Sequence, residues 1–380
     1  MNGRSAGMMT AAADSGDRQI ALLSCGPAEH AITDLSRRTA DLAVRQGFSG
    51  PIGYEPNPAR LLDLVAGLPA GIRVVGLQVS DWIYARVDGG AAVAIGAAAE
   101  QLARRGAAFV LTLHDLPRPG PDGLFESRAA GYRELAAAAD AVVVCSRYER
   151  DLLAALGADP GRCAVLPLPV DVDTDLVAPV DRPPADPVPP AHPFPPADLS
   201  PRGHPVPPAE RTVGIFGFLY PGKGHREVIE ALAGTGITVL ALGRPSDGQE
   251  YLLGQLTELA RQRGVTFEIT GYLPAGELGS RLRRVGVPVC PHTAISASAS
   301  INAWIGAGRR PLVADGPYAA ELAERMPGAL SRFPPEAMRA RIQAALNAPE
   351  QTWWPAGTPV GPSSDQIAAR YLTLLRGIPT

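Results

Sequence analysis

Thirteen of the chain's 39 prolines fall within thirty residues, 179–208, and this segment constrains the fold more than any other. Proline lacks a backbone N–H and fixes its own φ, so this segment is excluded from helix interiors and from central strands. We expect a semi-rigid, polyproline-like linker, with a docking motif for aromatic-groove domains as the alternative. At 380 residues the chain is long enough for two domains, and the linker falls near its middle.

On both sides of this linker, short apolar runs rich in β-branched residues alternate with Ala-, Leu- and Arg-rich stretches of helical length. This alternation is typical of parallel sheets that carry helices on both faces, so each half is predicted to be an α/β, doubly wound domain. The predicted strands are 19–24, 73–78, 108–113, 141–145 and 163–167 before the linker, and 212–216, 238–242, 265–269, 287–290 and 311–314 after it. The predicted helices include 32–46, 92–105, 148–156, 225–233, 250–263, 275–285, 301–307 and 318–325.

The domain plan follows from these assignments. We expect a disordered tail (1–17), a Rossmann-like N-terminal domain (18–177), the linker (178–210), a Rossmann-like C-terminal domain (211–350) and a C-terminal segment (351–380). Within the last segment, 367–376 is expected to form a helix that returns to the first domain. Ligands of such sheets bind outside the carboxyl ends of the strands, so two domains facing a cleft would place a site there.

Composition excludes several classes of function. The net charge of −3 gives no reason to expect nucleic acid, and the four cysteines form no CxxC pair, so neither zinc nor a disulfide framework is expected. No signal peptide and no apolar run long enough to span a membrane is found, so we expect a cytoplasmic protein. Asp171-Val172-Asp173 spells D-x-D but follows no nucleotide-binding strand, and we interpret it as part of the hinge, with no metal site.

Lys223 is the only lysine among 35 basic residues. A GC-rich, actinobacterial-type genome can deplete lysine by chance, but this one lies in Gly222-Lys223-Gly224, between a predicted strand and a predicted helix. A compact ammonium at such a turn is suited to meet a phosphate as a point charge. The sequence therefore predicts an anion site at the start of the second domain.

Several segments occur in an order known from one group of enzymes. Residues 216–225 contain the end of a predicted strand, the glycine loop and Lys223. Residues 301–314 are predicted to form a helix that leads into a strand, and the predicted strand in residues 110–115 ends in His114-Asp115. Two further segments are 268–273 with Glu277-Leu278, and 165–171. Together they resemble the GT-B glycosyltransferases, and most closely the retaining, nucleotide-sugar-dependent glycosyltransferase family 4 (group 1), over residues 18–346.

The resemblance implies a set of site residues. Lys223 would stabilise the charge on the leaving diphosphate, and His114 would face the donor sugar, so these two are the predicted catalytic residues. The other predicted donor-binding residues are Gly222, Arg244, Ser298, Ser300, Asn302 and Glu321. The predicted acceptor-side residues are Gly26, Glu29, His30, Trp82 and Asp115. For His114, a structural hydrogen-bonding role is the alternative.

Two departures from the family pattern stand out. The arginine that usually precedes the lysine is missing, and Arg226, Arg244 or Arg309 would have to replace it. The family's pair of glutamates is also absent, and Ser300 or Asn302 stands near the place of the second. Hydroxyl and amide groups still bond a sugar, and Ser298 or Ser300 can cap a helix whose N–H groups hold a diphosphate.

The sequence thus predicts a metal-independent, retaining glycosyltransferase whose donor is a nucleotide diphosphate sugar and whose acceptor is a small molecule. No cofactor is expected beyond that substrate, and no nucleic acid partner. Peripheral membrane contact through amphipathic helices of the first domain stays open. The alternatives are a non-catalytic GT-B relative that binds or regulates an active enzyme, and a same-fold enzyme that does not transfer sugars.

Overall fold

We describe residues 16–119, 123–173, 211–292 and 295–379 of a computed structural model. Two compact units divide the chain: one joins the residues up to Pro167 with those from Ser364 onward, and the other is Leu168–Ser363. The predicted linker (178–210) lies outside the described residues. So does the predicted tail except for its last two residues, of which Asp17 is buried and pairs with Arg376 through both carboxylate oxygens, at 2.7 Å each.

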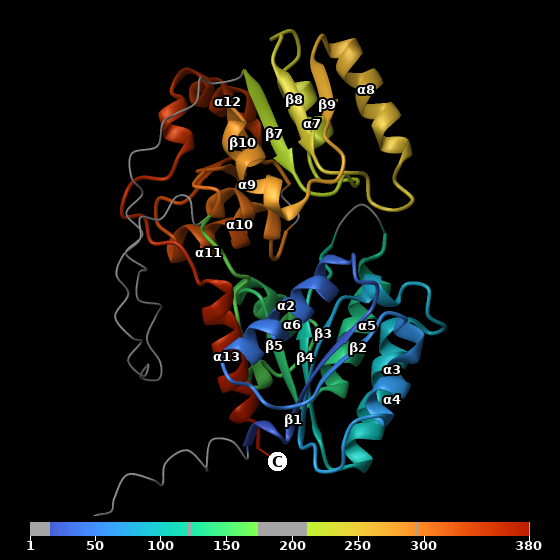
Figure 1. The fold of residues 1–380 in the computed structure, drawn as a ribbon. Coiled ribbons are helices and arrows are strands. Elements are labelled where there is room, and N and C mark those ends of the chain that lie inside the picture. The colour runs from blue at the N-terminus through green and yellow to red at the C-terminus, as the bar shows by residue number, and fades with distance from the viewer. Residues whose placement is uncertain (1–15, 120–122, 174–210, 293–294, 380) are drawn as a thin grey trace, which may run out of the picture. The chain divides into compact units, whose positions relative to one another are not determined.

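The first unit contains a six-stranded parallel sheet, in the order β2-β1-β3-β4-β5-β6 (Figure 1). Its strands are β1 (Ile20–Cys25), β2 (Ile52–Glu55), β3 (Val74–Val79), β4 (Ala108–Leu113), β5 (Ala141–Val144) and β6 (Cys163–Val165). Its helices are α2 (Ala31–Arg45), α3 (Leu61–Ala66), α4 (Gly90–Arg104), α5 (Phe125–Ala138), α6 (Arg147–Ala155) and α13 (Ser364–Arg376). The central strands β1 and β3 are buried along their whole length because both faces are covered, as expected for a parallel sheet.

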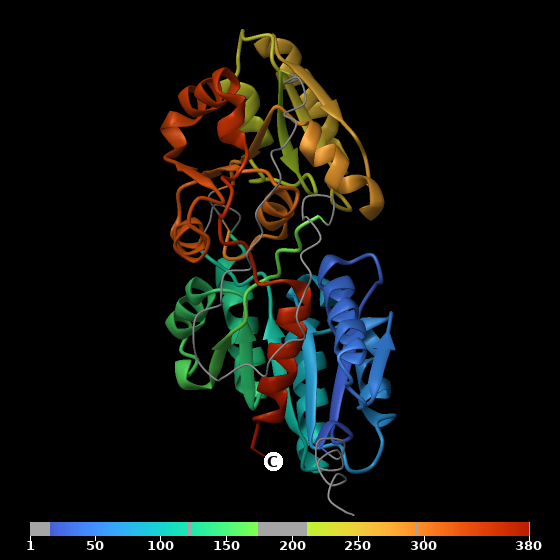
Figure 2. The same ribbon diagram turned by 60° about the vertical axis from the view of Figure 1, so that its left-hand side comes forward.

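The two faces of this sheet belong to different parts of the core. Alternate residues of the strands, such as Leu23 and Leu77, pack toward α3, α4 and α5, while Leu22 and Val74 pack toward α2 and α13. The helix α13 lies beside α2, as Figure 2 shows. Gly76 of β3 permits this close packing, because a Cβ atom there would stand 2.6 Å from the Tyr371 hydroxyl oxygen.

The second unit contains another six-stranded parallel sheet, in the order β12-β11-β10-β7-β8-β9. Its strands are β7 (Thr212–Phe216), β8 (Thr238–Leu242), β9 (Thr266–Ile269), β10 (Val287–Cys290), β11 (Leu312–Ala314) and β12 (Ser331–Phe333). Its helices are α7 (His225–Ala231), α8 (Tyr251–Arg263), α9 (Ala275–Arg284), α10 (Ala299–Gly306), α11 (Pro317–Arg325) and α12 (Met338–Asn347). The order reverses beside β7, between β10 and β8, which is where ligands bind in open α/β sheets.

Two doubly wound parallel sheets confirm the predicted fold class. Each sheet has six strands where five were predicted. The additional strands, β2 and β12, both lie at sheet edges. The sequence signal for these two strands is weak because β2 alternates exposed with half-buried residues and β12 has only three residues. Within the described residues, no helix combines the length and the apolar character needed to cross a bilayer.

Candidate functional site

A glycine-rich loop, 217–224, connects β7 to α7 in the second unit. Its three glycines, Gly217, Gly222 and Gly224, have φ values of 113°, 87° and 97°, which side-chain-bearing residues rarely adopt. At Gly217 a Cβ atom would stand 3.2 Å from the Lys223 Nζ, and at Gly224 it would stand 2.3 Å from the Pro291 Cγ. The loop therefore turns tightly over the end of β7 and folds Lys223 back against it.

Lys223 is buried, with 5% of its surface exposed. Its Nζ donates a hydrogen bond to the Ser300 Oγ at 3.1 Å and lies 5.7 Å from the centroid of the Tyr220 ring. In the part of the chain that the structure describes, no carboxylate forms an ion pair with it. Burial lowers the pKa of Lys223 from 10.5 to about 8. A buried ammonium without an opposite charge is an electrostatic arrangement that favours an incoming anion.

Serine hydroxyls continue from Lys223 to the start of α10. The Ser300 Oγ lies 3.0 Å from the Ser298 Oγ, and Ser298 caps α10 by accepting a hydrogen bond from the Ile301 N–H at 3.3 Å. The amino end of a helix, its capping hydroxyl and a buried cation thus meet in one place. Each of the three favours negative charge on a bound group.

Asn302 follows Ile301 on α10, and its side chain is held by hydrogen bonds to backbone carbonyl groups. Its Nδ2 donates to the carbonyl oxygens of Leu168 and Pro169, at 3.2 and 3.0 Å. Its Oδ1 is buried and has no partner within the described residues. The Nδ2 of Asn302 is therefore used within the domain, and its Oδ1 is the side-chain atom that can accept a hydrogen bond from a ligand.

The three candidates for the missing arginine differ sharply. Arg309 is 1% exposed and donates all its hydrogen bonds within the domain, to backbone carbonyls and to the Thr352 hydroxyl, so it is not available to a diphosphate. Arg226 is exposed on α7 beside Glu230. Arg244 follows β8, stacks at 5.0 Å on the Phe218 ring and pairs with Asp247 at 2.7 Å, so it lies next to the loop.

Glu321, a predicted donor-binding residue, is buried on α11. Asp173, of the D-x-D sequence, is engaged by the Arg283 guanidinium of α9, and its N–H bonds the Gly306 carbonyl at 3.0 Å. Asp173 thus connects the start of the second unit to α9 and α10. The described residues contain no cluster of three or more His, Cys, Asp or Glu side chains able to hold a metal.

In the first unit, His114 follows β4 and is buried. Its Nε2 lies 3.0 Å from the Gln78 Oε1, its Nδ1 lies 3.4 Å from the Cys145 Sγ, and its carbonyl accepts a hydrogen bond from the Tyr132 hydroxyl. Burial lowers the pKa of His114 to about 4, although Asp115 opposes the shift, so the ring is neutral at pH 7. Both ring nitrogens have partners inside the domain, which matches the structural alternative; the catalytic role stays a prediction.

Asp115 has a left-handed backbone conformation, with φ of 58°, which is uncommon for residues other than glycine. Its Oδ2 accepts a hydrogen bond from Ser80 at 2.8 Å and its carbonyl accepts one from Arg128 at 2.6 Å. Arg128 also binds both oxygens of Asp81, at 2.6 and 2.9 Å, and lies 4.9 Å from the centre of the Trp82 ring. Trp82 is half exposed, so this edge of the sheet presents an aromatic face beside an acidic group.

The other acceptor-side predictions lie at the same edge, after β1. Gly26 has φ of 120°, and a Cβ there would stand 2.7 Å from the Ile83 Cγ2, so β1 and the short 3-10 helix Asp81–Tyr84 meet closely. Glu29 is exposed, and the His30 Nδ1 caps α2 by accepting from the Ile32 N–H at 3.3 Å. Burial lowers the pKa of His30, with Asp115 opposing.

Sequence reasoning missed the Ser80–Asp81–Arg128 group and the Gln78 and Cys145 partners of His114. Ser80-Asp81 follows β3 just as His114-Asp115 follows β4, so the strand-end rule applied once more would have found it. Arg128 comes from α5 and carries no local signal. It reaches this edge only through tertiary packing.

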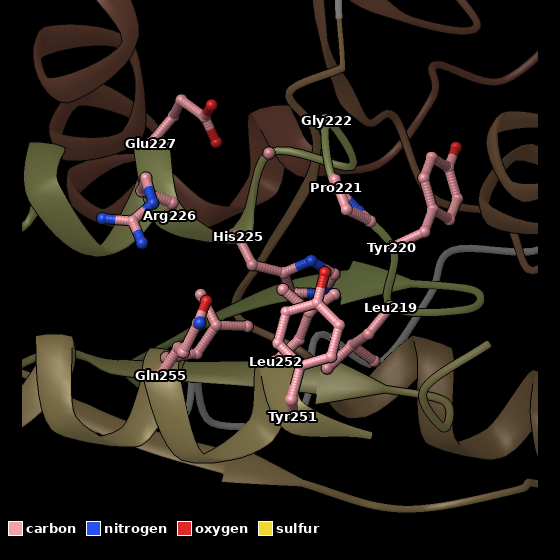
Figure 3. Close-up of a pocket in the computed structure, with 12 residues that line it drawn as sticks. Leu219, Tyr220, Pro221, Gly222, His225, Arg226, Glu227, Tyr251, Leu252 and Gln255 are labelled. Atoms are coloured by element: carbon pink, nitrogen blue, oxygen red, sulfur yellow. The ribbon is translucent and has the colours of Figure 1, made fainter. Parts of the chain in front are cut away.

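A pocket of about 260 Å³ lies beside the glycine loop, on the side of α7 and α8 (Figure 3). Its lining includes Tyr220, Gly222 and Gly224 of the loop, but not Lys223 or Ser300. Within the loop, Lys223 therefore packs against Ser300, whereas Tyr220, Gly222 and Gly224 line the pocket.

Comparison with known proteins agrees with the geometry of both units. Residues 4–169, less than half of the chain, match the family model described as "Glycosyl transferase 4-like domain". No curated protein matches the chain in sequence.

Among solved structures, HepE of Anabaena in complex with UDP is similar with a TM-score of 0.62 at 14% identity, over 95% of this chain and 100% of that one. Sucrose-phosphate synthase of Thermosynechococcus elongatus gives 0.65 at 15% identity, over 94% and 98%. The lipopolysaccharide outer core galactosyltransferase WaaB gives 0.53 at 12% identity, over 94% and 96%. The predicted GT-B fold is confirmed by these likenesses, and the predicted enzyme class, glycosyltransferase, by the N-terminal family match.

Proposed function

We propose that this glycosyltransferase moves a sugar from a nucleotide diphosphate sugar to a small-molecule acceptor, with retention of configuration and without a metal ion. The observation that carries the proposal is Lys223: a buried ammonium, without a carboxylate partner in the described residues, at a glycine loop that leads into a helix. The nucleotide diphosphate is the anion that fits the predicted family. UDP is the first nucleotide to test, because the similar structure of HepE holds UDP.

Lys223 and the start of α10 have complementary roles in this proposal. When the bond between the sugar and the phosphate breaks, negative charge grows on the departing diphosphate, and a fixed cation in a water-poor site stabilises it. Ser300 holds the ammonium in place at 3.1 Å, and the amino end of α10 adds N–H groups. These groups need not move during the reaction, so little reorganisation energy is spent.

The chemistry needs few other side chains. The bond from the anomeric carbon to the phosphate oxygen breaks, the bond from that carbon to the acceptor oxygen forms on the same face, and the acceptor proton passes to the departing phosphate. This path uses no carboxylate base and no metal. It is compatible with the absence of the paired glutamates, whose second position is near Ser300 and Asn302.

The acceptor is assigned to the first unit. Trp82 offers a half-exposed ring and Asp115 an exposed carboxylate, and the Arg128 contacts fix both at the carboxyl edge of the sheet. An aromatic face beside hydrogen-bonding groups suits a hydroxylated small molecule.

The test measures UDP release from UDP-glucose and a panel of other donors, with and without a chelator. Transfer is expected in the wild type, unchanged by the chelator, and reduced by at least about a hundredfold in Lys223→Ala. Arg261→Ala, at an exposed position of α8 outside the loop and the pocket lining, is the control and should keep full activity. Turnover that is unchanged in Lys223→Ala would remove the proposed role of this residue, and turnover that needs an added metal would remove metal independence.

A binding protein without turnover is the second candidate. It is favoured by Asn302, which stands near the place of a family glutamate and spends its amide nitrogen on backbone carbonyls. UDP binding by the wild type, combined with no release from any donor in the presence of acceptor sugars, would support this candidate over the enzyme.

A further inference from the structure

The pocket beside the glycine loop contains a buried polar group that nothing in the domain satisfies. His225 begins α7, and its side chain points into the pocket on the side of Tyr251 and Leu252 (Figure 3). It is 3% exposed, and its Nε2 has no hydrogen-bond partner in the described part of the chain. An unpaired buried donor or acceptor costs roughly 1–3 kcal/mol, which a ligand that bonds it would return.

The charge of the pocket indicates the kind of ligand. Burial and, to a smaller extent, the neighbouring charge of Lys223 lower the pKa of His225 to about 3, so the imidazole is neutral. At the rim, Arg226 and Glu227 carry opposite charges, and Arg226 lies 3.8 Å from Glu230. No net charge faces the pocket, so an anion such as a phosphate gains little there and a neutral molecule is favoured.

The shape and lining narrow the choice. About 260 Å³ lies just below the range of about 300–1,000 Å³ typical of ligand pockets, which suits a single ring rather than a nucleotide. Tyr251 is 53% exposed, and Gln255 is exposed on α8. An aromatic face, an amide and a neutral imidazole together match a ring that has C–H faces and hydroxyl groups.

We propose that this pocket is a second binding site, which takes a neutral sugar ring, with His225 and Gln255 bonded to its hydroxyls and Tyr251 against its face. The site is separate from the contacts of Lys223, because neither Lys223 nor Ser300 lines it. It shares the loop with them, since Tyr220, Gly222 and Gly224 form one wall. A sugar bound in this pocket therefore contacts and stabilises the loop that contains Lys223.

The experiment titrates the full chain with methyl α-glucoside in the absence of nucleotide, by saturation-transfer NMR and by the ¹⁵N spectra of its six histidines. The His225 signal is identified by its loss in His225→Asn. It is expected to shift on titration, and Tyr251→Ala and Gln255→Ala should each weaken binding by about fivefold or more, as the loss of about 1 kcal/mol implies. Gln262→Ala, on the same helix but outside the pocket, is the matched control and should bind like the wild type.

Three results would overturn the proposal: no His225 shift at the highest sugar concentration, equal binding by all variants, or displacement of the sugar by UDP. A His225 shift caused by inorganic phosphate in place of the sugar would also overturn it. The outcome is independent of the proposed catalytic role, because Lys223→Ala should keep the sugar affinity whether or not it loses nucleotide binding.

Discussion

Replacing Lys223 by methionine is expected to stabilise the folded C-terminal domain while removing its affinity for nucleotide diphosphates. Methionine has a similar length and no charge, so it fills the space of the lysine stem without needing a partner. The lysine is buried to 5% exposure, and its one hydrogen bond in the described residues goes to Ser300. The domain therefore carries the desolvation cost of the ammonium in the absence of ligand.

The size of this cost follows from the pKa of Lys223. A decrease from 10.5 to about 8 corresponds, at about 1.4 kcal/mol per pH unit, to roughly 3 kcal/mol of unfavourable free energy. Loss of the hydrogen bond to Ser300 returns about 1 kcal/mol of this. We therefore expect Lys223→Met to raise the free energy of unfolding by about 2 kcal/mol at pH 7.

The pH dependence has a definite sign. Below pH 8 the lysine is charged in the folded and the unfolded chain, so the wild type carries the full cost. Between pH 8 and 10.5 the unfolded chain binds the proton that the folded chain has released, so the stability of the wild type rises with pH. The advantage of Lys223→Met should therefore be complete at pH 7 and should shrink toward pH 10.

Calorimetry at pH 7 and pH 10 measures the effect, with hydrogen exchange of β7 and β8 to identify the transition of the C-terminal domain, since a two-domain chain need not unfold in one step. UDP should raise the unfolding temperature of the wild type and leave Lys223→Met unchanged. Arg226→Met, an exposed cation on α7, should alter stability by less than about 0.5 kcal/mol. A methionine variant that is less stable than the wild type at pH 7, or that UDP stabilises equally, would refute the reasoning.

Three further predictions concern the same loop and the edge of the first sheet. The affinity for UDP, measured by titration calorimetry, should fall by up to about tenfold per pH unit above pH 8 as Lys223 loses its proton, and a constant affinity from pH 7 to 9 would contradict this. In chemical denaturation, Asp115→Ala should lower the free energy of unfolding by about 1–2 kcal/mol, because the variant loses the hydrogen bond to Ser80 and keeps a φ of 58°. Asp115→Gly should lower it by less, because glycine adopts this φ without strain. A larger loss for Asp115→Gly than for Asp115→Ala would contradict backbone strain at this position. Gly224→Ala should lower the free energy of unfolding by about 2–4 kcal/mol, because its Cβ would stand 2.3 Å from the Pro291 Cγ. Gly248→Ala, at a glycine with φ of 79° and open space around it, should lower it by about 1 kcal/mol in the same measurement. Equal losses for the two variants would show that Pro291 moves aside without cost.

The parts of the fold that were predictable are those with strong periodic signals. The central strands of both sheets and most helices follow from apolar runs and helical stretches, since burial on both faces of a parallel sheet leaves a clear mark on the sequence. The edge strands β2 and β12 carry no such mark, because an edge is half exposed and short.

The candidate site divides in the same way. Lys223, Ser298 and His114 were found because each lies at a turn next to a strand or helix end, where a local pattern can be read. The contacts that define their chemistry could not be read: Ser300 meets Lys223 from 77 positions away, and Gln78 meets His114 from 36. Arg309 shows the limit most clearly, since a surface-like arginine in the sequence is buried among carbonyl groups in the fold.

The helix α13 has a consequence for how the protein is made. It supplies Tyr371, Leu372 and Leu375 to the core of the first unit, and Arg376 to the buried Asp17, 359 positions away. The first domain emerges first from the ribosome, yet its core has a gap until α13 is translated, after the whole second domain. Until then the sheet face that α2 and α13 share is covered by α2 alone, and a chain truncated before α13 is expected to expose the rest of that face to chaperones or to aggregation.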